Sequence, residues 1–434
     1  MNTTLASDIE HRLRRRHIPE LPDHFVLPHY GGYSIANIAP TIAQVFGIEL
    51  EGSARALPED LWLDMAGDVE CVILLLVDAA GYLQLRRFMA GETSLFSRLA
   101  LEGRLFPITS VFPSTTVTAL TSIWTGETPL AHGFLGTTLL LPEQGVLANM
   151  LKMAPAAYAG GGGLEKWGWN AEDFIRTPSL AHQLEAGGVR TVAHTRRHFI
   201  GSILTQIFLQ GIDALRGYLD LGDLWVNLRR TLVERRPGER LLVDVYWGGV
   251  DNVGHVYGTE NAYMPAALRH FTRSLEEDFL TTLAPEAREN TLLIVAADHG
   301  QIATPPERVV RLPDHPGLQE TLLLPPAGES RAAYLYARPG AKRPLRAYVH
   351  EHLAEDFVLV DTEHALEAGL WGPAQEVPGA LRVRLGDAVL VARNDARLST
   401  RRKEDDRSSL HGHHGSLTPE EMLVPLLMAR LDAL

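Results

Sequence analysis

Five short apolar runs, separated by segments long enough to form helices, constrain the fold of this chain more than any other feature. The runs are 71–77, 105–111, 189–193, 241–247 and 291–297. A strand with one face in water would alternate apolar and polar residues, but these runs are apolar at nearly every position. Strands buried on both faces are typical of a parallel sheet covered by helices on each side. The sequence therefore predicts an α/β fold with a mostly parallel sheet sandwiched between helices.

The chain, at 434 residues, is longer than one typical domain. Residues 306–404 have a pattern of their own, with short apolar segments and a helix near 345–353. The apolar segments are 332–337, 357–360, 381–385 and 388–392. We expect 306–404 to be an inserted α+β unit, 1–305 to be the first part of the α/β core, and 405–434 to return to that core.

Composition narrows the class of partner. The chain has 40 basic and 53 acidic residues, a net charge of −13, so neither a nucleic-acid polymer nor an anionic membrane is expected to bind it. An acidic protein that handles a negative substrate needs local positive charge, and metal ions are one source. The single cysteine, Cys71, lies in an apolar run and is predicted to be buried and inert. Because no apolar run has the length of a membrane span and the first residues lack a secretory apolar core, we expect a cytoplasmic protein.

A cluster of four hydroxyl residues and a proline, within 112–118, stands where the run 105–111 ends and a helix could begin. At a helix start, unpaired backbone N–H groups and the positive end of the helix dipole stabilise a bound phosphate. A hydroxyl at this place is aimed at that phosphate, as a nucleophile must be. The alternative is an ordinary helix N-cap, which is the commoner role of an isolated Ser/Thr cluster.

Three of the predicted strands are followed by residues of the kind that bind metals. They are Asp78 after the first run, Asp251 shortly after the fourth, and Asp298 with His299 after the fifth. The carboxyl ends of parallel strands meet at one edge of a sheet, where the connecting loops bind ligands. We therefore expect these side chains to lie close together.

Further histidines extend this set. His255 is four residues after Asp251, close enough to meet it on one side of a helical turn. A further group of histidines lies late in the chain, at 411–414. Gly300 directly follows His299 and is free to adopt a positive φ at a sharp turn. Asp, His and an alkoxide are the ligands expected for zinc or manganese rather than magnesium alone.

Each of these residues also has an ordinary interpretation. Asp78 could be a helix cap, His255 a hydrogen-bonded core residue, and 411–414 a surface cluster. A single two-metal site explains them jointly.

Taken in order, the motifs resemble the alkaline phosphatase superfamily, and within it the type I phosphodiesterase/nucleotide pyrophosphatase branch. The matching motifs are Phe112-Pro113-Ser114-Thr115-Thr116, Trp124-Thr125-Gly126, His132-Gly133, Asp251-x-x-x-His255, Asp298-His299-Gly300 and a late His-Gly. The resemblance implies an alkaline-phosphatase-like sheet, with 306–404 as a cap. It also implies a metal-dependent hydrolase of small-molecule phosphoesters that uses two divalent cations, zinc or manganese.

The resemblance also assigns roles. Thr116 matches the nucleophile that forms a phosphothreonine intermediate. The implied metal ligands are Asp78, Asp298, His299 and the Thr116 oxygen at one site, and Asp251, His255 and His414 at the other, with His411 as the fallback for His414. Thr137 stands where the diesterases usually carry an asparagine that donates to a phosphate oxygen, so it is the expected phosphate donor. This departure leaves the preference for diesters open.

The sequence leaves two alternatives open. The same site could serve a phosphomonoesterase, a phosphonate hydrolase or a mutase-like phosphoryl transfer. The protein could also be a metal-stabilised binding module without catalysis, although no ligand position or nucleophile is missing.

Overall fold

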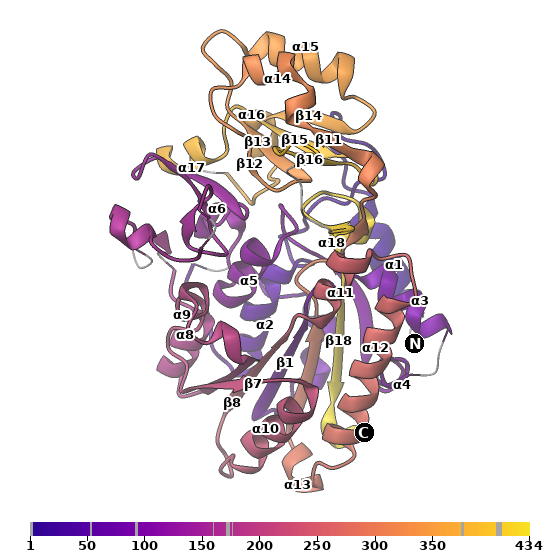
Figure 1. Ribbon diagram of the computed structural model, residues 1–434. Coiled ribbons are helices and arrows are strands. Elements are labelled where there is room, and N and C mark those ends of the chain that lie inside the picture. The colour runs from indigo at the N-terminus through magenta and orange to yellow at the C-terminus, as the bar shows by residue number, and fades with distance from the viewer. Residues whose placement is uncertain are drawn as a thin grey trace.

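The computed structural model describes residues 3–52, 54–91, 94–158, 160–170, 174–175, 177–374, 377–404 and 410–434. A large α/β core carries a smaller cap that contains a second sheet (Figure 1). Within the described chain, no helix is both long enough and apolar enough to cross a bilayer.

The core sheet has seven strands in the order β2-β18-β9-β1-β8-β6-β7. Its strands are β1 (Cys71–Val77), β2 (Arg104–Thr109), β6 (Arg190–Arg196), β7 (Ala214–Tyr218), β8 (Leu241–Trp247), β9 (Thr291–Ala296) and β18 (Leu423–Arg430). Only β18 runs antiparallel to its neighbours. The predicted mostly parallel α/β sheet is confirmed, and all five apolar runs are strands in it. The sequence pattern did not indicate β7, because four of its five residues are only half-buried and it has no continuous apolar run.

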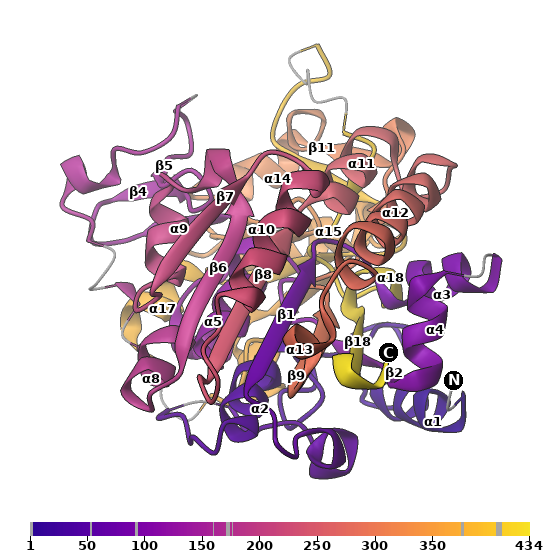
Figure 2. The ribbon, with the colours of Figure 1, turned by 90° about the horizontal axis from the view of Figure 1, so that it is seen from below.

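Helices cover both faces of this sheet (Figure 2). One face carries α2 (Ile38–Val45), α5 (Thr116–Thr125) and α8 (Leu180–Ala186), and the other carries α3 (Tyr82–Gly91), α4 (Leu95–Glu102), α10 (Leu221–Val233) and α12 (Tyr263–Ser274). Helix α1 (Thr3–Arg14) packs beside the edge strand β2. The sequence of α10 shows why such helices form. Asp220 caps its first turn reciprocally with Asp223, and the residues buried against the core recur at helical spacing.

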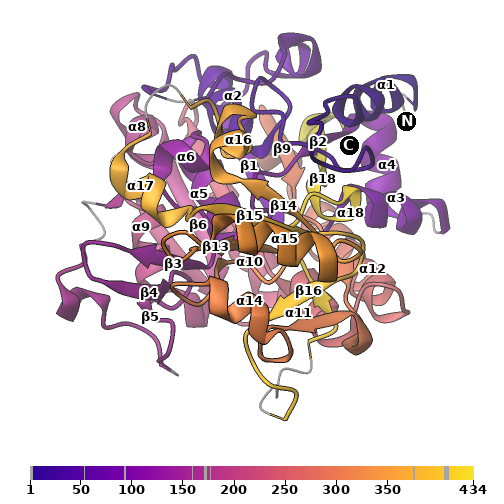
Figure 3. The same cartoon turned by 90° about the horizontal axis from the view of Figure 1, so that it is seen from above.

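The cap is built around a second seven-stranded sheet, in the order β14-β15-β13-β12-β3-β4-β5. Four strands come from the predicted insertion: β12 (Ala327–Gly328), β13 (Ala332–Leu335), β14 (Phe357–Asp361) and β15 (Ala388–Ala392). The other three, β3 (Thr138–Leu141), β4 (Val146–Asn149) and β5 (Ala154–Pro155), come from much earlier in the chain. The two groups meet where Gly328 pairs with Thr138. Figure 3 shows this joint sheet from above.

Helices complete the cap: α14 (Pro316–Thr321), α15 (Lys342–His352), α16 (Thr362–Glu367) and α17 (Gly379–Arg384). The apolar segment 381–385 thus lies largely in a helix. The domain limits at 305/306 and 404/405 stay predictions, since the cap sheet also contains β3 to β5 and residues 405–409 lie outside the described part.

Candidate active site

The hydroxyl cluster lies at the start of α5, as its position after the second apolar run suggested. Thr115 is the N-cap residue, with φ −141° and ψ 146°, but its side chain makes no capping hydrogen bond. Thr116 is the first helical residue, and the first intrahelical bond runs from the Ala119 N–H to the Thr115 carbonyl at 2.9 Å. The backbone N–H groups of Thr116 to Thr118 precede that bond, so the helix start presents donors beside the Thr116 hydroxyl.

Two buried carboxylates lie beside this hydroxyl. Asp78 follows β1 and Asp298 follows β9; their residues are 3% and 1% exposed. Each has one oxygen that accepts hydrogen bonds: the Tyr246 hydroxyl donates to Asp78 Oδ2, and the N–H groups of Ala79 and His299 donate to Asp298 Oδ1. Among the described residues, the other oxygens, Asp78 Oδ1 and Asp298 Oδ2, are buried without a hydrogen-bond partner. Burying two carboxylates side by side is unfavourable in free energy, because their charges repel, unless a cation lies between them.

His299 joins these carboxylates to the nucleophile candidate. Its Nε2 atom is 3.1 Å from Thr116 Oγ1, 3.3 Å from Asp298 Oδ2 and 3.6 Å from Asp78 Oδ1. The side chain of His299 is fully buried.

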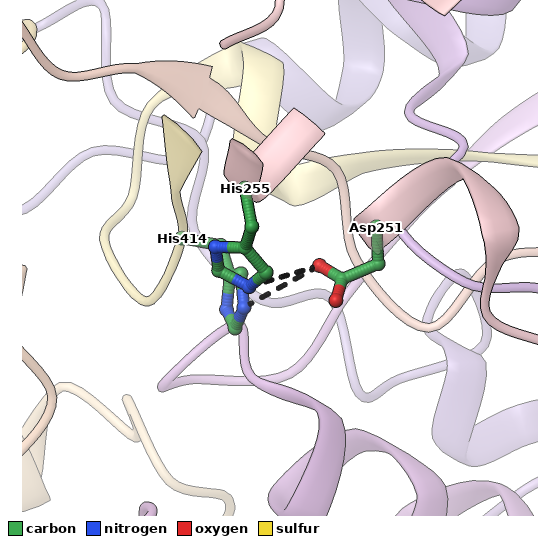
Figure 4. Close-up of side chains that lie close together, drawn as sticks. All are labelled: Asp251, His255 and His414. Atoms are coloured by element: carbon green, nitrogen blue, oxygen red, sulfur yellow. Dashed lines mark ion pairs between the residues drawn. The ribbon is translucent and has the colours of Figure 1, made fainter. Parts of the chain in front are cut away.

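A second group lies next to the first. Figure 4 shows the imidazoles of His255 and His414 directed at the Asp251 carboxylate. Their Nε2 atoms are 3.2 Å and 3.8 Å from Asp251 Oδ1. Asp251 and His255 lie on one side of α11 (Gly249–Tyr257), as their spacing predicted. His414 follows β17 (Gly412–His413), which pairs with β10 (Ile302–Ala303) and so places the late histidine group beside the chain that leaves His299.

The three histidines share one feature that fits metal ligation. Each places Nδ1 against a backbone carbonyl: His255 on Gly412 at 2.7 Å, His299 on Gly300 at 3.0 Å and His414 on Ser114 at 3.0 Å. A carbonyl can only accept, so Nδ1 carries the proton and Nε2 keeps its lone pair toward the site. The ligand atoms form two overlapping sets, Asp251, His255 and His414, and Asp78, Asp251 and His299. Within each set they lie within 4.8 Å of one another.

These donors fit divalent cations, because two carboxylate oxygens without a hydrogen-bond partner among the described residues lie beside imidazole Nε2 atoms whose lone pairs face the site. The structure thus brings together all six predicted carboxylate and imidazole side chains and Thr116. His411 is exposed and belongs to neither set of ligand atoms.

The model of the type I phosphodiesterase / nucleotide pyrophosphatase family matches residues 72–417, most of the chain. The chain belongs to this family. The match confirms the predicted enzyme class, a metal-dependent phosphoric ester hydrolase.

Solved structures with the same architecture include two kinds of protein. Murine ectonucleotide pyrophosphatase / phosphodiesterase 5 is 15% identical, with a TM-score of 0.60 over 82% of this chain and 87% of that chain. Phosphonoacetate hydrolase from Sinorhizobium meliloti 1021, in complex with phosphonoacetate, is 19% identical, with a TM-score of 0.60 over 84% of this chain and 94% of that chain. At these identities the likeness shows a shared fold. No curated protein matches the chain.

Burial and neighbouring charged groups shift the pKa values of the site residues. Burial, together with the charges of Asp298 and Asp251, raises the pKa of Asp78 well above its ordinary value. Burial and the neighbouring His299 and His255 lower the pKa of His414. Burial alone would lower the pKa of His255, but its contact with Asp251 outweighs this effect and raises it. Excess negative charge and a neutral His414 both suit a site completed by cations.

Sequence reasoning missed several residues that hold the ligands. Ser114 accepts from the Gly415 N–H at 3.2 Å and donates to the Ser416 carbonyl at 2.8 Å, which fixes the His414 loop against the start of α5. Tyr246 bonds Asp78, and Gln301 donates to Asp251 Oδ1 at 3.1 Å. Ser114 and Tyr246 are polar groups beside strand ends, which is a usable signal, whereas the partner of Gln301 depends on packing alone.

Gly300 corrects one expectation, since it does not adopt the positive φ that its sequence suggested. A Cβ atom at Gly300 would lie 1.9 Å from the Glu420 carbonyl oxygen. The glycine is required there because another backbone segment approaches closely, and its N–H donates to the Glu421 carbonyl at 2.8 Å.

Two other motif residues have structural surroundings. His132 is buried, accepts from the Phe134 N–H at 3.1 Å and lies 3.0 Å from Ser122 Oγ; burial lowers its pKa to about 3. The Thr137 hydroxyl lies 3.4 Å from the Thr115 hydroxyl, and the Thr137 N–H donates to Glu329 Oε1 at 2.6 Å. A carboxylate, Glu329, therefore stands beside the residue expected to donate to phosphate.

Proposed function

We propose that this protein hydrolyses phosphoesters through a phosphothreonine intermediate on Thr116, with two divalent cations held by the carboxylate and imidazole cluster. The observation that carries the proposal is the Thr116 hydroxyl at the start of α5, 3.1 Å from His299 Nε2 and beside oxygens of Asp78 and Asp298 that have no hydrogen-bond partner among the described residues.

The proposed ligands fall into two sites. They are Asp78, Asp298, His299 and the Thr116 oxygen at the first, and Asp251, His255 and His414 at the second. Zinc is favoured over manganese because three imidazoles enter the set. When bound, the cations would supply Lewis-acid charge that favours the alkoxide of the nucleophile and offsets the charge of the phosphoryl group.

The chain supplies the rest of the chemistry. Thr116 Oγ1 forms a bond to phosphorus while the bond to the leaving alcohol breaks, and water then hydrolyses the phosphothreonine to regenerate the hydroxyl. The backbone N–H groups at the start of α5 would donate to the phosphoryl oxygens. His299, anchored through Nδ1, holds Nε2 3.1 Å from Thr116 Oγ1, so that one cation could reach both atoms.

A small-molecule phosphodiester is the favoured substrate class. The family is that of type I phosphodiesterases and nucleotide pyrophosphatases. An inactive threonine-to-alanine variant of the murine phosphodiesterase was solved in complex with AMP, which supports a threonine nucleophile on this fold. Thr137 remains the proposed donor to phosphate. The acidic chain disfavours a nucleic-acid polymer, and a cytoplasmic location stays a prediction.

Phosphonate hydrolysis is the second candidate, because phosphonoacetate hydrolase shares the fold. The charges around Thr116 disfavour a substrate that carries a carboxylate. The described residues lining the adjacent cavity include Asp78, Asp244 and Asp251, but no lysine or arginine that could pair with a second anion.

The decisive experiment compares Thr116→Ala with Thr115→Ala on metal-analysed protein. We expect Thr116→Ala to lower turnover of a p-nitrophenyl phosphodiester by about 10³-fold or more while metal content stays near two equivalents. Mass spectrometry of acid-quenched wild-type protein should find phosphate on the peptide that contains Thr116. Near-normal activity of Thr116→Ala, with loss in Thr115→Ala, would place the nucleophile one residue earlier and refute the proposal.

A further inference from the structure

A cavity of about 300 Å³ opens beside Thr116, between α5 and β8. Three of its lining residues, Thr116, Leu120 and Trp124, are spaced four apart on α5 and therefore lie on one face of that helix. Eight residues of helix span roughly 12 Å, so the cavity leads from the nucleophile about two turns along α5. We call it the Asp244 cavity, because Asp244 is one of its lining residues.

The opposite wall comes from β8. Tyr246 and Asp244 both line the cavity and stand two residues apart, on the same face of the strand. Tyr246 contacts Asp78 at the metal cluster, so Asp244 lies one strand repeat, roughly 7 Å, farther along β8. Helix α9 (Ile203–Phe208) closes the cavity with mostly apolar side chains such as Leu204 and Phe208.

Asp244 is the exceptional group in this apolar surrounding. It is 3% exposed, and its Oδ1 atom is buried without a hydrogen-bond partner among the described residues. Burial raises the pKa of Asp244 well above its ordinary value. A buried carboxyl group without a hydrogen-bond partner lowers the stability of the folded protein. At a cavity wall, a ligand that pairs with the group would remove this cost.

The charges of the cavity define that ligand. Asp78 and Asp251 border it near Thr116 and belong to the proposed metal ligands, whereas Asp244 lies away from them along β8. The described lining residues include no lysine, arginine or histidine. A second anionic group would meet an unpaired carboxyl there, but a protonated amine would pair with it.

We propose that the Asp244 cavity binds the alcohol-derived group that stays on phosphorus when the leaving group departs, and that Asp244 selects groups carrying a protonated amine. The inference rests on the proposed function, because the cavity matters to substrate choice only if Thr116 is the reacting group. It narrows the substrate class to phosphodiesters of amino alcohols with a short apolar body.

Two esters with the same leaving group provide the test: p-nitrophenyl 2-aminoethyl phosphate and p-nitrophenyl propyl phosphate. They differ in an ammonium against a methyl group of similar size. We expect the wild-type enzyme to prefer the aminoethyl ester by about tenfold or more in kcat/KM, as for a buried charge-assisted hydrogen bond. In Asp244→Asn the ratio should fall to within about threefold, because only the aminoethyl ester loses a charge partner.

The control is Asp213→Asn, which removes a carboxylate whose side chain is 56% exposed and should leave the ratio unchanged. A binding measurement separates this inference from the function on which it rests. Calorimetry with both esters on Thr116→Ala protein should show the same preference for the aminoethyl ester, lost in the Thr116→Ala/Asp244→Asn double variant. If the wild type shows no preference, or Asp244→Asn keeps it, the inference is overturned even where Thr116 proves to be the nucleophile.

Discussion

The buried ion pair between Arg331 and Glu421 joins the cap to the His414 loop, and breaking it should damage both stability and metal binding. Both side chains are fully buried. Arg331 donates from Nε to Glu421 Oε1 at 2.7 Å and from a terminal nitrogen to Oε2 at 2.8 Å. Glu421 also accepts from the Ser416 N–H at 2.9 Å and the Thr418 hydroxyl at 2.7 Å.

The substitution Arg331→Met leaves the Glu421 carboxylate buried with only the two weaker donors. Removing one partner of a buried pair costs about 3–5 kcal/mol, a large share of a total stability of about 5–15 kcal/mol. Ser416 is two residues after His414, so a shift of this loop also moves a proposed ligand. Outer-shell changes of this kind lower metal affinity by about 10- to 100-fold.

Urea denaturation of zinc-loaded protein measures the first effect, and zinc titration against a competing chelator measures the second. The control is Arg98→Met, because Arg98 is 47% exposed and its pair with Glu276 at 2.6 Å is a surface pair worth at most about 1 kcal/mol. If Arg331→Met also changes the free energy of unfolding by less than about 1 kcal/mol and zinc affinity is unaltered, the pair does not hold the loop as argued.

Three further results are expected. Gly254→Ala would place a Cβ atom 1.6 Å from Gln301 Oε1 and should cost about 1–3 kcal/mol and lower metal content, whereas Gly67→Ala, with open space around it, should do neither. Burial raises the pKa of Asp244, so the folded state holds a proton that the unfolded chain releases near pH 4. The stability of the wild-type protein therefore falls as the pH rises above this value. In urea titrations, Asp244→Asn should gain stability over wild type between about pH 4 and 8. Burial raises the pKa of Asp78, so a proton competes more strongly with a cation for this carboxylate as the pH falls. Chelation should therefore lower the melting temperature more at pH 8 than at pH 5, and added zinc should restore it; equal shifts at both pH values would contradict this reasoning.

Much of the core was predictable because its signals are local. A strand buried on both faces, such as β1 or β9, is an apolar run whatever its neighbours are. The order of Asp78, Asp251 and Asp298 after such runs was enough to predict their convergence, since parallel strands end at one edge. The hydroxyl cluster was likewise visible as the start of a helix.

Long-range pairings were not predictable in the same way. The cap sheet joins residue 138 to residue 328 through one backbone pairing, and no local pattern indicates that β3 to β5 belong with the later strands. Arg331 and Glu421 are 90 positions apart, and each alone is an ordinary charged residue.

The sequence by itself determined the class of sheet, the helix that presents Thr116 and the kinds of side chain that gather beside it, because these depend on periodicity and on residue chemistry. The tertiary structure decided which polar atoms have hydrogen-bond partners and which do not. Nδ1 of each of the three site histidines lies against a backbone carbonyl. Asp78 Oδ1, Asp298 Oδ2 and Asp244 Oδ1 have no hydrogen-bond partner among the described residues. Whether a polar atom is satisfied depends on every segment that packs around it, so only the folded chain reveals it.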